Sequence, residues 1–255
     1  MNNKTEFFTE LPPPTSDCLL PTDNLLEIPV LRLERQPESV RVPVLCYGEQ
    51  QRSKDMHGQG ILHFYTDDYR FRSIYDHPEK ILRHNPGAIV EPNFSLFNET
   101  PLAFGLQSIY KKRWISRIMQ DQGIPVFVDL NVANKWYELN LVGVPNGYGA
   151  FATRGYSERM AALEYEYELA SRVADGNLRF FLVYGGGKDV QDWCMKHRCA
   201  YYITPTITIK NRIKAIEQMK ANTVAVSSLE SSLPIKANAS EENLFEQQIM
   251  NNPEL

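Results

Sequence analysis

Hydrophobic residues along this chain fall into short runs separated by longer stretches of helical character. The short runs are largely apolar, mostly rich in β-branched or aromatic residues, and bounded by glycine, proline or polar residues, which is typical of buried strands. Runs such as PVFVDL and RFFLVY show no alternation, as expected of strands that are covered on both faces. The pattern predicts strands over residues 61–65, 88–91, 126–130, 139–144, 149–153, 180–184 and 200–203.

Helical patterns fill the intervals between these strands. The first opens with Thr100-Pro101, a good N-cap followed by a first-turn proline, and stops before Gly123. The predicted helices cover residues 100–122, 157–174, 188–197 and 210–220. This alternation predicts an α/β protein with a mostly parallel sheet, open or barrel-like, with helices between the strands.

Charge and composition divide the 255 residues into a folded region and two flanks. Residues 40–222 hold 23 Lys/Arg against 19 Asp/Glu, a balance of +4, whereas the flanks together carry −8. We therefore expect a Pro-rich acidic arm over 1–39, one α/β domain over 40–222 and a disordered, acidic polar tail over 223–255. Residues 25–34 (LLEIPVLRLE) could dock as a strand.

The composition excludes several classes of protein. With 43% hydrophobic residues the chain is not wholly disordered, and no apolar run reaches the roughly 18–20 residues of a membrane span. The N-terminus lacks the apolar core of a signal peptide. Four scattered cysteines favour a reducing, cytoplasmic setting over a disulfide scaffold.

Polar residues follow most of the predicted strands. Because ligands bind beyond the carboxyl ends of parallel strands, these residues predict a polar cleft with catalytic groups. They are Asp67, Asp68, Glu91, Asp129 and Arg154. The acids would suit Mg²⁺ or Mn²⁺ if they converge. The alternatives are salt bridges to Arg70, Arg72 and Arg154, and turn-forming residues placed for backbone reasons alone.

Three glycines, Gly185, Gly186 and Gly187, stand between a predicted strand and a helix and are followed by Lys188. Their bare N–H groups could bind a phosphate, with Lys188 as a counter-charge. The spacing does not match G-x-x-x-x-G-K-[ST], because Leu182 occupies the first glycine position and Asp189 the Ser/Thr position. A simple tight turn is the alternative.

The segment IYKKRWISRIM contains the strongest concentration of positive charge. Lys111, Lys112, Arg113 and Arg117 are interleaved there with Trp114. Lysine and arginine beside an aromatic ring can bind a nucleic-acid backbone and stack on bases. The same pattern is also that of an amphipathic helix with its basic face in water.

The stretch from His63 to about residue 203 resembles the domain-of-unknown-function 4417 family, found in phage, plasmid and other mobile-element proteins. The similarity is carried by FYTDDYRF, EPNFSLFNETPLA, the 110–117 basic segment, QGIPVFVDLNV, FATRGY and LVYGGG. The family pattern has Asp where Asn93 stands here, which weakens a metal role for that position. The resemblance implies a mobile-element context and a shared polar cleft, and it implies no particular activity.

Two functions and a third alternative follow from these observations. The first is a plasmid or phage protein that binds or acts on DNA or RNA, in replication or maintenance. The second is a small-molecule or nucleotide-binding enzyme that uses the same cleft, and the third is a non-catalytic interaction module. No membrane partner is expected.

Overall fold

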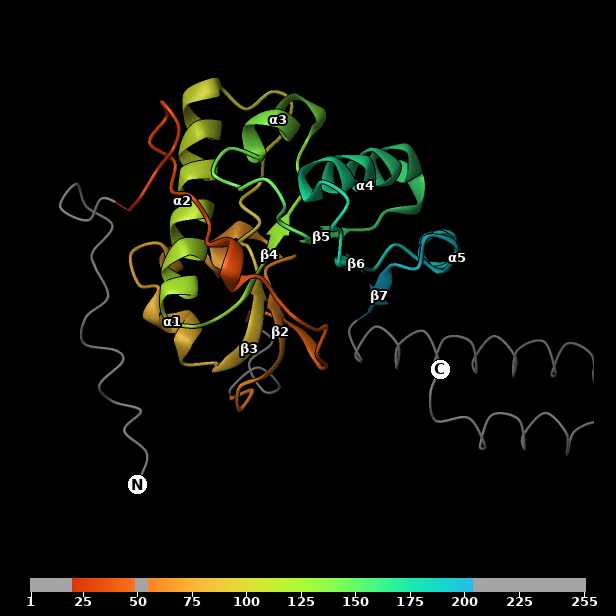
Figure 1. The fold of residues 1–255 in the computed structure, drawn as a ribbon, viewed down its shortest axis with the longest axis horizontal. Helices are drawn as coiled ribbons and strands as arrows, with labels where there is room; N and C mark the ends of the chain where they lie inside the picture. Colours follow the sequence, from red (N-terminus) through yellow and green to blue (C-terminus); the bar gives the residue numbers. More distant parts are fainter. Residues whose placement is uncertain (1–19, 49–54, 204–255) are drawn as a thin grey trace, which may run out of the picture. The chain divides into compact units, whose positions relative to one another are not determined.

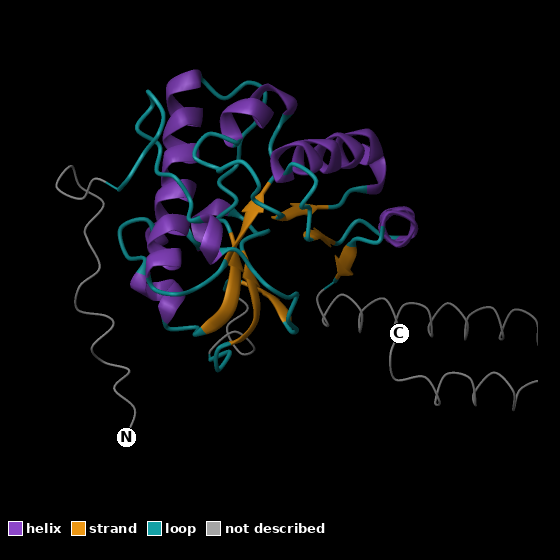
Figure 2. Cartoon of the chain, in the orientation of Figure 1, coloured by secondary structure: helices purple, strands orange, loops and turns teal. Residues whose placement is uncertain are grey.

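The computed structural model describes residues 20–48 and 55–203, all within the first of two compact units, residues 1–204. These residues form a seven-stranded parallel sheet in which the strands lie in sequence order. Figure 2 shows the strands in orange with the helices packed beside them. The strands are β1 (Val44–Cys46), β2 (Gln59–His63), β3 (Pro86–Val90), β4 (Val126–Asp129), β5 (Ala150–Arg154), β6 (Phe180–Tyr184) and β7 (Ala200–Tyr202). The predicted α/β class with a mostly parallel sheet is therefore confirmed.

The sheet curls into an incomplete barrel. His63 ends β2 and Tyr184 ends β6, yet their ring centroids lie only 4.1 Å apart although three strands separate them. The register places paired residues on the same face, so that Asp129 lies beside Ala152 and Arg154 beside Tyr184. No pairing joins β7 back to β1 within the described ranges.

Helices follow most of the strands and cover the outside of the curled sheet (Figure 1). In α2, Trp114, Ile115 and Met119 belong to the same buried cluster as Leu62 and Ile89 of the sheet. The helices are α1 (Glu79–Leu82), α2 (Leu102–Asp121), α3 (Tyr137–Asn140), α4 (Met160–Ala174) and α5 (Lys188–His197). Short 3₁₀ turns are η2 (Leu33–Arg35), η3 (Asp68–Arg70), η4 (Arg72–Ile74), η5 (Asn134–Trp136) and η6 (Ser157–Arg159).

One predicted strand is wrong and one observed strand is not predicted by the pattern. Residues 139–144 form the end of α3 and a turn, in which Gly143 adopts φ +79° and has no room for a side chain, because a Cβ there would lie 2.2 Å from the Pro29 carbonyl oxygen. Strand β1 has only three residues and follows Pro43, so its apolar run is too short to predict a strand. The predicted helix 210–220 and the tail 223–255 lie outside the described residues.

Residues 20–39 differ from the loosely held arm that composition suggests. Ile28 and Leu31 are each 2% exposed, and the Leu31 amide donates to Gly143 O at 2.8 Å. Gln120 of α2 accepts from the Arg32 amide at 2.7 Å and donates to the Arg32 carbonyl at 3.1 Å. Instead of forming a strand over 25–34, this segment runs along α2 and buries the side of the helix that would otherwise face water.

Gly105 allows α2 to pack on Trp136, and this contact provides a test of the fold. A Cβ at Gly105 would lie 1.9 Å from Cη2 of the buried Trp136 ring. In an exposed helix Gly→Ala would stabilise by about 1 kcal/mol, but here we expect Gly105→Ala to lower the free energy of unfolding by about 1–3 kcal/mol. Urea unfolding monitored by circular dichroism measures this.

The matched control is Trp136→Phe, which removes the ring atoms nearest Gly105. In the Gly105→Ala background this second substitution should cost less than it does alone, because the smaller ring relieves the overlap. Strictly additive losses in the double variant would contradict the proposed contact.

Candidate functional site

A polar pocket of about 710 Å³ opens at the carboxyl ends of the strands. Its walls come from the segments after β2, β3, β4 and β5, which is where parallel α/β sheets place ligands. The polar lining residues include Thr66, Asp67, Asn93, Ser95, Asn98, Glu99, Asn131, Asn134, Arg154, Tyr156 and Arg159.

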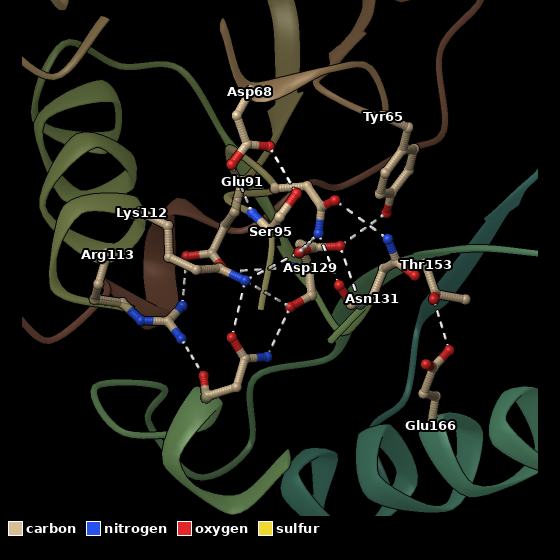
Figure 3. A network of polar contacts seen from close by, with 12 residues as sticks. Tyr65, Asp68, Glu91, Ser95, Lys112, Arg113, Asp129, Asn131, Thr153 and Glu166 are labelled. Carbon is tan, nitrogen blue, oxygen red and sulfur yellow. Dashed lines mark hydrogen bonds and ion pairs between the residues drawn. The ribbon is translucent and has the colours of Figure 1, made fainter. Parts of the chain in front are cut away.

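Asp129 is fully buried and lies at the centre of a network of polar side chains that includes residues lining the pocket (Figure 3). Its Oδ1 accepts from the Tyr65 hydroxyl at 3.1 Å and from the Asn131 amide at 3.1 Å. Its Oδ2 accepts from Asn93 Nδ2 at 2.8 Å and from Lys112 Nζ at 3.0 Å. With four donors, this fully buried carboxylate is satisfied, and it fixes Tyr65, Asn93 and Asn131 in place.

Two buried ion pairs join the strand ends to α2. Arg113 donates to Glu91 Oε1, and Lys112 bonds Asp129, so two carboxylates meet two cations with 1% exposure or less on every side chain. Asn140 of α3 completes the set by accepting from Lys112 Nζ at 2.9 Å and donating to the Asp129 carbonyl at 2.9 Å. The charges cancel within the protein, as a buried network requires.

Asp68 fixes one wall of the pocket. Its carboxylate accepts from the Ser95 amide and from the Ser95 hydroxyl, each at 2.9 Å, and so ties the loop after β2 to the loop after β3. The neighbouring Asp67 lines the pocket and lies 3.7 Å from Arg70. Asp68 thus has a structural partner, while Asp67 keeps a largely exposed carboxylate.

Arg154 and Arg159 supply positive charge to the pocket. Both guanidinium groups pack on the ring of Tyr156, at 5.1 and 5.2 Å from its centroid. Both side chains are exposed, and neither forms an ion pair with a carboxylate among the described residues. A cation–π contact orients such groups without neutralising them, so both charges remain available to a ligand.

Glu166 of α4 is buried beside Thr153, the residue that directly precedes Arg154. Its carboxyl lies within hydrogen-bonding distance of Thr153 Oγ1, at 2.6 Å, and of the Tyr137 hydroxyl, at 3.2 Å. Burial raises the pKa of Glu166 to about 8, against the opposing effect of those two hydrogen bonds. The group therefore carries its proton at neutral pH and adds no charge to the site.

His63 occupies the interior of the barrel end as a neutral imidazole. Burial, with a smaller contribution from Arg154, lowers the pKa of His63 to about 3. Its Nδ1 accepts from the Tyr65 amide at 3.2 Å, so the proton resides on Nε2, which has no hydrogen-bond partner in the described part of the chain. The Tyr65 hydroxyl is kept protonated by burial and by Asp129, which raise its pKa.

The five strand-end residues predicted as catalytic are brought together only in part. Asp67 and Arg154 line the pocket and Asp129 lies under it. Glu91 faces α2 from the outer side, and Asp68 is bound to Ser95. Within the described ranges no group of three His, Cys, Asp or Glu side chains is placed to hold a metal ion.

The basic segment of α2 lies in a different environment from the predicted phosphate-facing surface. Lys112, Arg113 and Arg117 are buried, and Arg117 donates to the Val30 carbonyl at 2.6 Å. Lys111 is half-buried, with its ammonium 5.0 Å from the centre of the Tyr75 ring. The positive charge of this helix is therefore used mainly inside the protein.

The glycine run after β6 lies outside the pocket and has a backbone explanation. Gly185, Gly186 and Gly187 all adopt positive φ, and a Cβ at Gly186 would lie 2.7 Å from the Gly155 carbonyl carbon. Lys188 pairs with Asp192 at 2.9 Å. This geometry matches the tight-turn alternative.

Three residues in or beside the site, Tyr156, Arg159 and Glu166, are not among the site residues predicted from the sequence. Arg159 and Tyr156 come two to five residues after the strand end and belong to the turn before α4. Glu166 has a helical position that resembles those of the neighbouring exposed glutamates. A useful signal for the first two is the RGYSER segment, where two arginines flank a tyrosine.

Replacing Lys112 tests the buried network. We expect Lys112→Met to lower the free energy of unfolding by about 3–5 kcal/mol, because Asp129 and Asn140 lose a buried donor. The adjacent Lys111→Met should cost about 1 kcal/mol or less, since it removes a single ring contact. Equal losses in urea unfolding of the two variants would contradict the difference in burial.

Glu166→Gln tests the protonated carboxyl. In the folded chain Glu166 keeps its proton up to about pH 8, whereas its ordinary pKa is 4.5. Through this group the protein therefore loses stability as the pH rises from about 4.5 to about 8, by up to ~1.4 kcal/mol per pH unit. Urea unfolding at pH 5, 6.5 and 8 should show a flatter dependence in the variant. The exposed Glu168→Gln on the same helix should keep the wild-type slope, and identical slopes in all three proteins would refute the assignment.

Comparison with known proteins connects the chain to phages. The Gene 1 protein of Mycobacterium phage D29 is 41% identical over 69 residues, 26% of this chain and 26% of that protein. The Gene 1 protein of Mycobacterium phage L5 is also 41% identical over 69 residues, 26% of this chain and 30% of that protein. The aligned region thus spans less than a third of either relative, and both support a phage and mobile-element association.

No solved structure gives a significant match. Within the described residues, none of the helices combines the length and the apolar character needed to cross a bilayer. A family model, described as a domain of unknown function (DUF4417), matches residues 20–197. The match begins well upstream of His63 and includes the segment that docks on α2. The chain therefore belongs to the DUF4417 family.

Proposed function

We propose that this protein binds single-stranded nucleic acid, as part of phage or plasmid replication or maintenance, and that the strand-end pocket holds the phosphate of one nucleotide. The observation that carries the proposal is the pair Arg154 and Arg159, which line the pocket without a carboxylate partner among the described residues. Exposed arginines in a concave site favour phosphate, because the guanidinium fork matches its oxygens.

The rest of the pocket suits the other parts of a nucleotide. Asp129 accepts from the side-chain amide of Asn93 and from the backbone N–H of Asn131, and Asn131 Nδ2 donates to Asn93 Oδ1. Phe97 lines the pocket and is 64% exposed, while its backbone is fixed by Thr100 and Trp136. An aromatic ring on a rigid loop is a stacking surface for an unpaired base of a neighbouring nucleotide in the strand.

The dimensions favour a single strand over a duplex. A volume of about 710 Å³ is that of a small-molecule site, and one extended nucleotide is the part of a nucleic acid that such a pocket can enclose. Two acids, Asp67 and Glu99, also line it, and Asp67 has Arg70 at 3.7 Å. Asp67 and Arg154 are the members of the predicted catalytic set that would meet the ligand directly.

The volume of the pocket, about 710 Å³, also favours a second candidate, a nucleotide-binding enzyme acting on a free nucleotide. The two candidates share their ligand contacts and differ in whether the chain of phosphates continues beyond the pocket. An oligonucleotide should bind more tightly than a single nucleotide if it makes further contacts outside the pocket. A free nucleotide makes all of its contacts inside the pocket.

The arginine pair provides the direct test. We expect Arg154→Ala with Arg159→Ala to weaken binding of a ten-residue single-stranded oligonucleotide at least tenfold. The slope of log affinity against log salt should also fall, by about 0.7 for each phosphate that the protein no longer neutralises. Fluorescence anisotropy at several salt concentrations measures both quantities. A duplex of the same sequence should bind more weakly to the wild type.

Arg179→Ala is the matched control, because Arg179 is exposed and directly precedes β6, at the opposite end of that strand from the pocket. It should change the affinity less than twofold. An unchanged affinity in the double variant, or an equal loss in the control, would overturn the proposed site. The α2 lysine and arginine are unsuitable for this test, since Lys112 and Arg113 are buried.

A further inference from the structure

A second pocket of about 300 Å³ adjoins the first beside α4. It is lined by Asn134, Tyr137, Ala161, Ala162 and Tyr165, a mainly apolar set from η5, α3 and the start of α4. Asn134 also lines the larger pocket, so the two spaces meet at this residue. No motif in the sequence points to this slot.

The aromatic members of this slot are held in fixed positions. Tyr137 is 3% exposed, and its hydroxyl donates to Glu166 at 3.2 Å. Tyr165 is 43% exposed, and its ring centroid lies 5.1 Å from that of Tyr137 at an interplanar angle of 54°. The two rings therefore form one rigid aromatic side with part of Tyr165 open to a ligand.

The remaining members leave space and offer polar edges. Ala161 and Ala162 are small, and a larger side chain at either position would fill the slot. Asn134 is exposed, and its side-chain amide has no hydrogen bond among the described residues. A free side-chain amide carries both a donor and an acceptor, the combination that matches the edge of a nucleobase.

Charge is arranged next to this slot in the order that a nucleotide requires. Arg159 lies two residues before Ala161 and faces the larger pocket, where Arg154 joins it over Tyr156. The slot itself contains no charged side chain among the residues described. A ligand that spans both spaces must have an anionic end at the arginines and a flat, uncharged end at Tyr165.

We infer that the slot is a base-binding subsite, in which the base of a nucleotide unit stacks on Tyr165 and meets Asn134 while its phosphate lies on Arg154 and Arg159. This inference rests on the proposed function and deepens it by placing the base. The shared chemistry is a nucleoside monophosphate, either free or as one residue of a single strand.

Calorimetric titration of the full chain tests the subsite with three probes, inorganic phosphate, ribose 5-phosphate and adenosine monophosphate. In the wild type the nucleotide should bind at least tenfold more tightly than ribose 5-phosphate, because stacking adds to the phosphate contact. Tyr165→Ala should remove that advantage and leave ribose 5-phosphate unchanged. Tyr69→Ala is the matched control, an exposed tyrosine that does not line the slot.

Ala162→Leu gives a second variant that preserves the fold, because leucine is a good helix former and position 162 is half-buried. Its side chain should fill the slot and reduce adenosine monophosphate binding to the level of ribose 5-phosphate. Circular dichroism confirms that the variant is folded before the titration.

The outcomes separate this inference from the proposed function. Equal binding of the nucleotide and ribose 5-phosphate, both abolished in the Arg154→Ala, Arg159→Ala variant, would overturn the base subsite and leave the phosphate site standing. Loss of nucleotide binding in Tyr165→Ala but not in the arginine variant would support the slot and overturn the phosphate site. A decamer that binds over tenfold more tightly than the monophosphate, with the same dependence on Tyr165, identifies the single strand as the source, and equal affinity identifies the free nucleotide.

Discussion

The fold depends on compensation of two acids that the parallel sheet buries at its carboxyl edge. Glu91 directly follows β3 and Asp129 ends the neighbouring strand β4, and both are fully buried, so each needs a cation at hydrogen-bonding distance. Arg113 and Lys112 of α2 meet that need, and Asn140 of α3 joins them to the Asp129 backbone. These contacts fix the positions of α2, α3 and the ends of β3 and β4 relative to one another. An apolar contact alone would specify that arrangement less strictly.

This compensation explains why the basic segment of α2 is ambiguous in the sequence. A helix with four cations in seven positions is ordinarily solvated on that face, and an amphipathic interpretation assumes one dry side. In this protein the sheet covers one side and residues 20–36 cover much of the other, where Arg117 donates to Val30 and Gln120 to Arg32. The missing information is tertiary, because nothing in the local pattern of α2 indicates the segment that packs over it.

Strand positions are more predictable than the site, and for a physical reason. Runs such as 180–184 are buried on both faces, and this leaves a strong apolar signature that the structure confirms to the residue in β6. The segment 139–144 has a similar apolar pattern but forms no strand. Asn140 donates to the Asp129 carbonyl, and Gly143 lies in a turn that packs against Pro29. The rule that ligands bind at strand ends leads to Asp67, Asp129 and Arg154, but it cannot say which acid faces the pocket and which faces α2.

The direction from which each counter-charge arrives determines the electrostatics of the pocket. Because Lys112 and Arg113 approach from the helix side, the charges of Glu91 and Asp129 are cancelled before they reach the opening. Glu166, the next buried acid, is neutral because burial raises its pKa to about 8. Arg154 and Arg159 have no such partner in the described part of the chain. A protein with a net charge of −4 can therefore place two arginines without a carboxylate partner on one wall of a pocket that Asp67 and Glu99 also line, because the buried acids are compensated inside the protein.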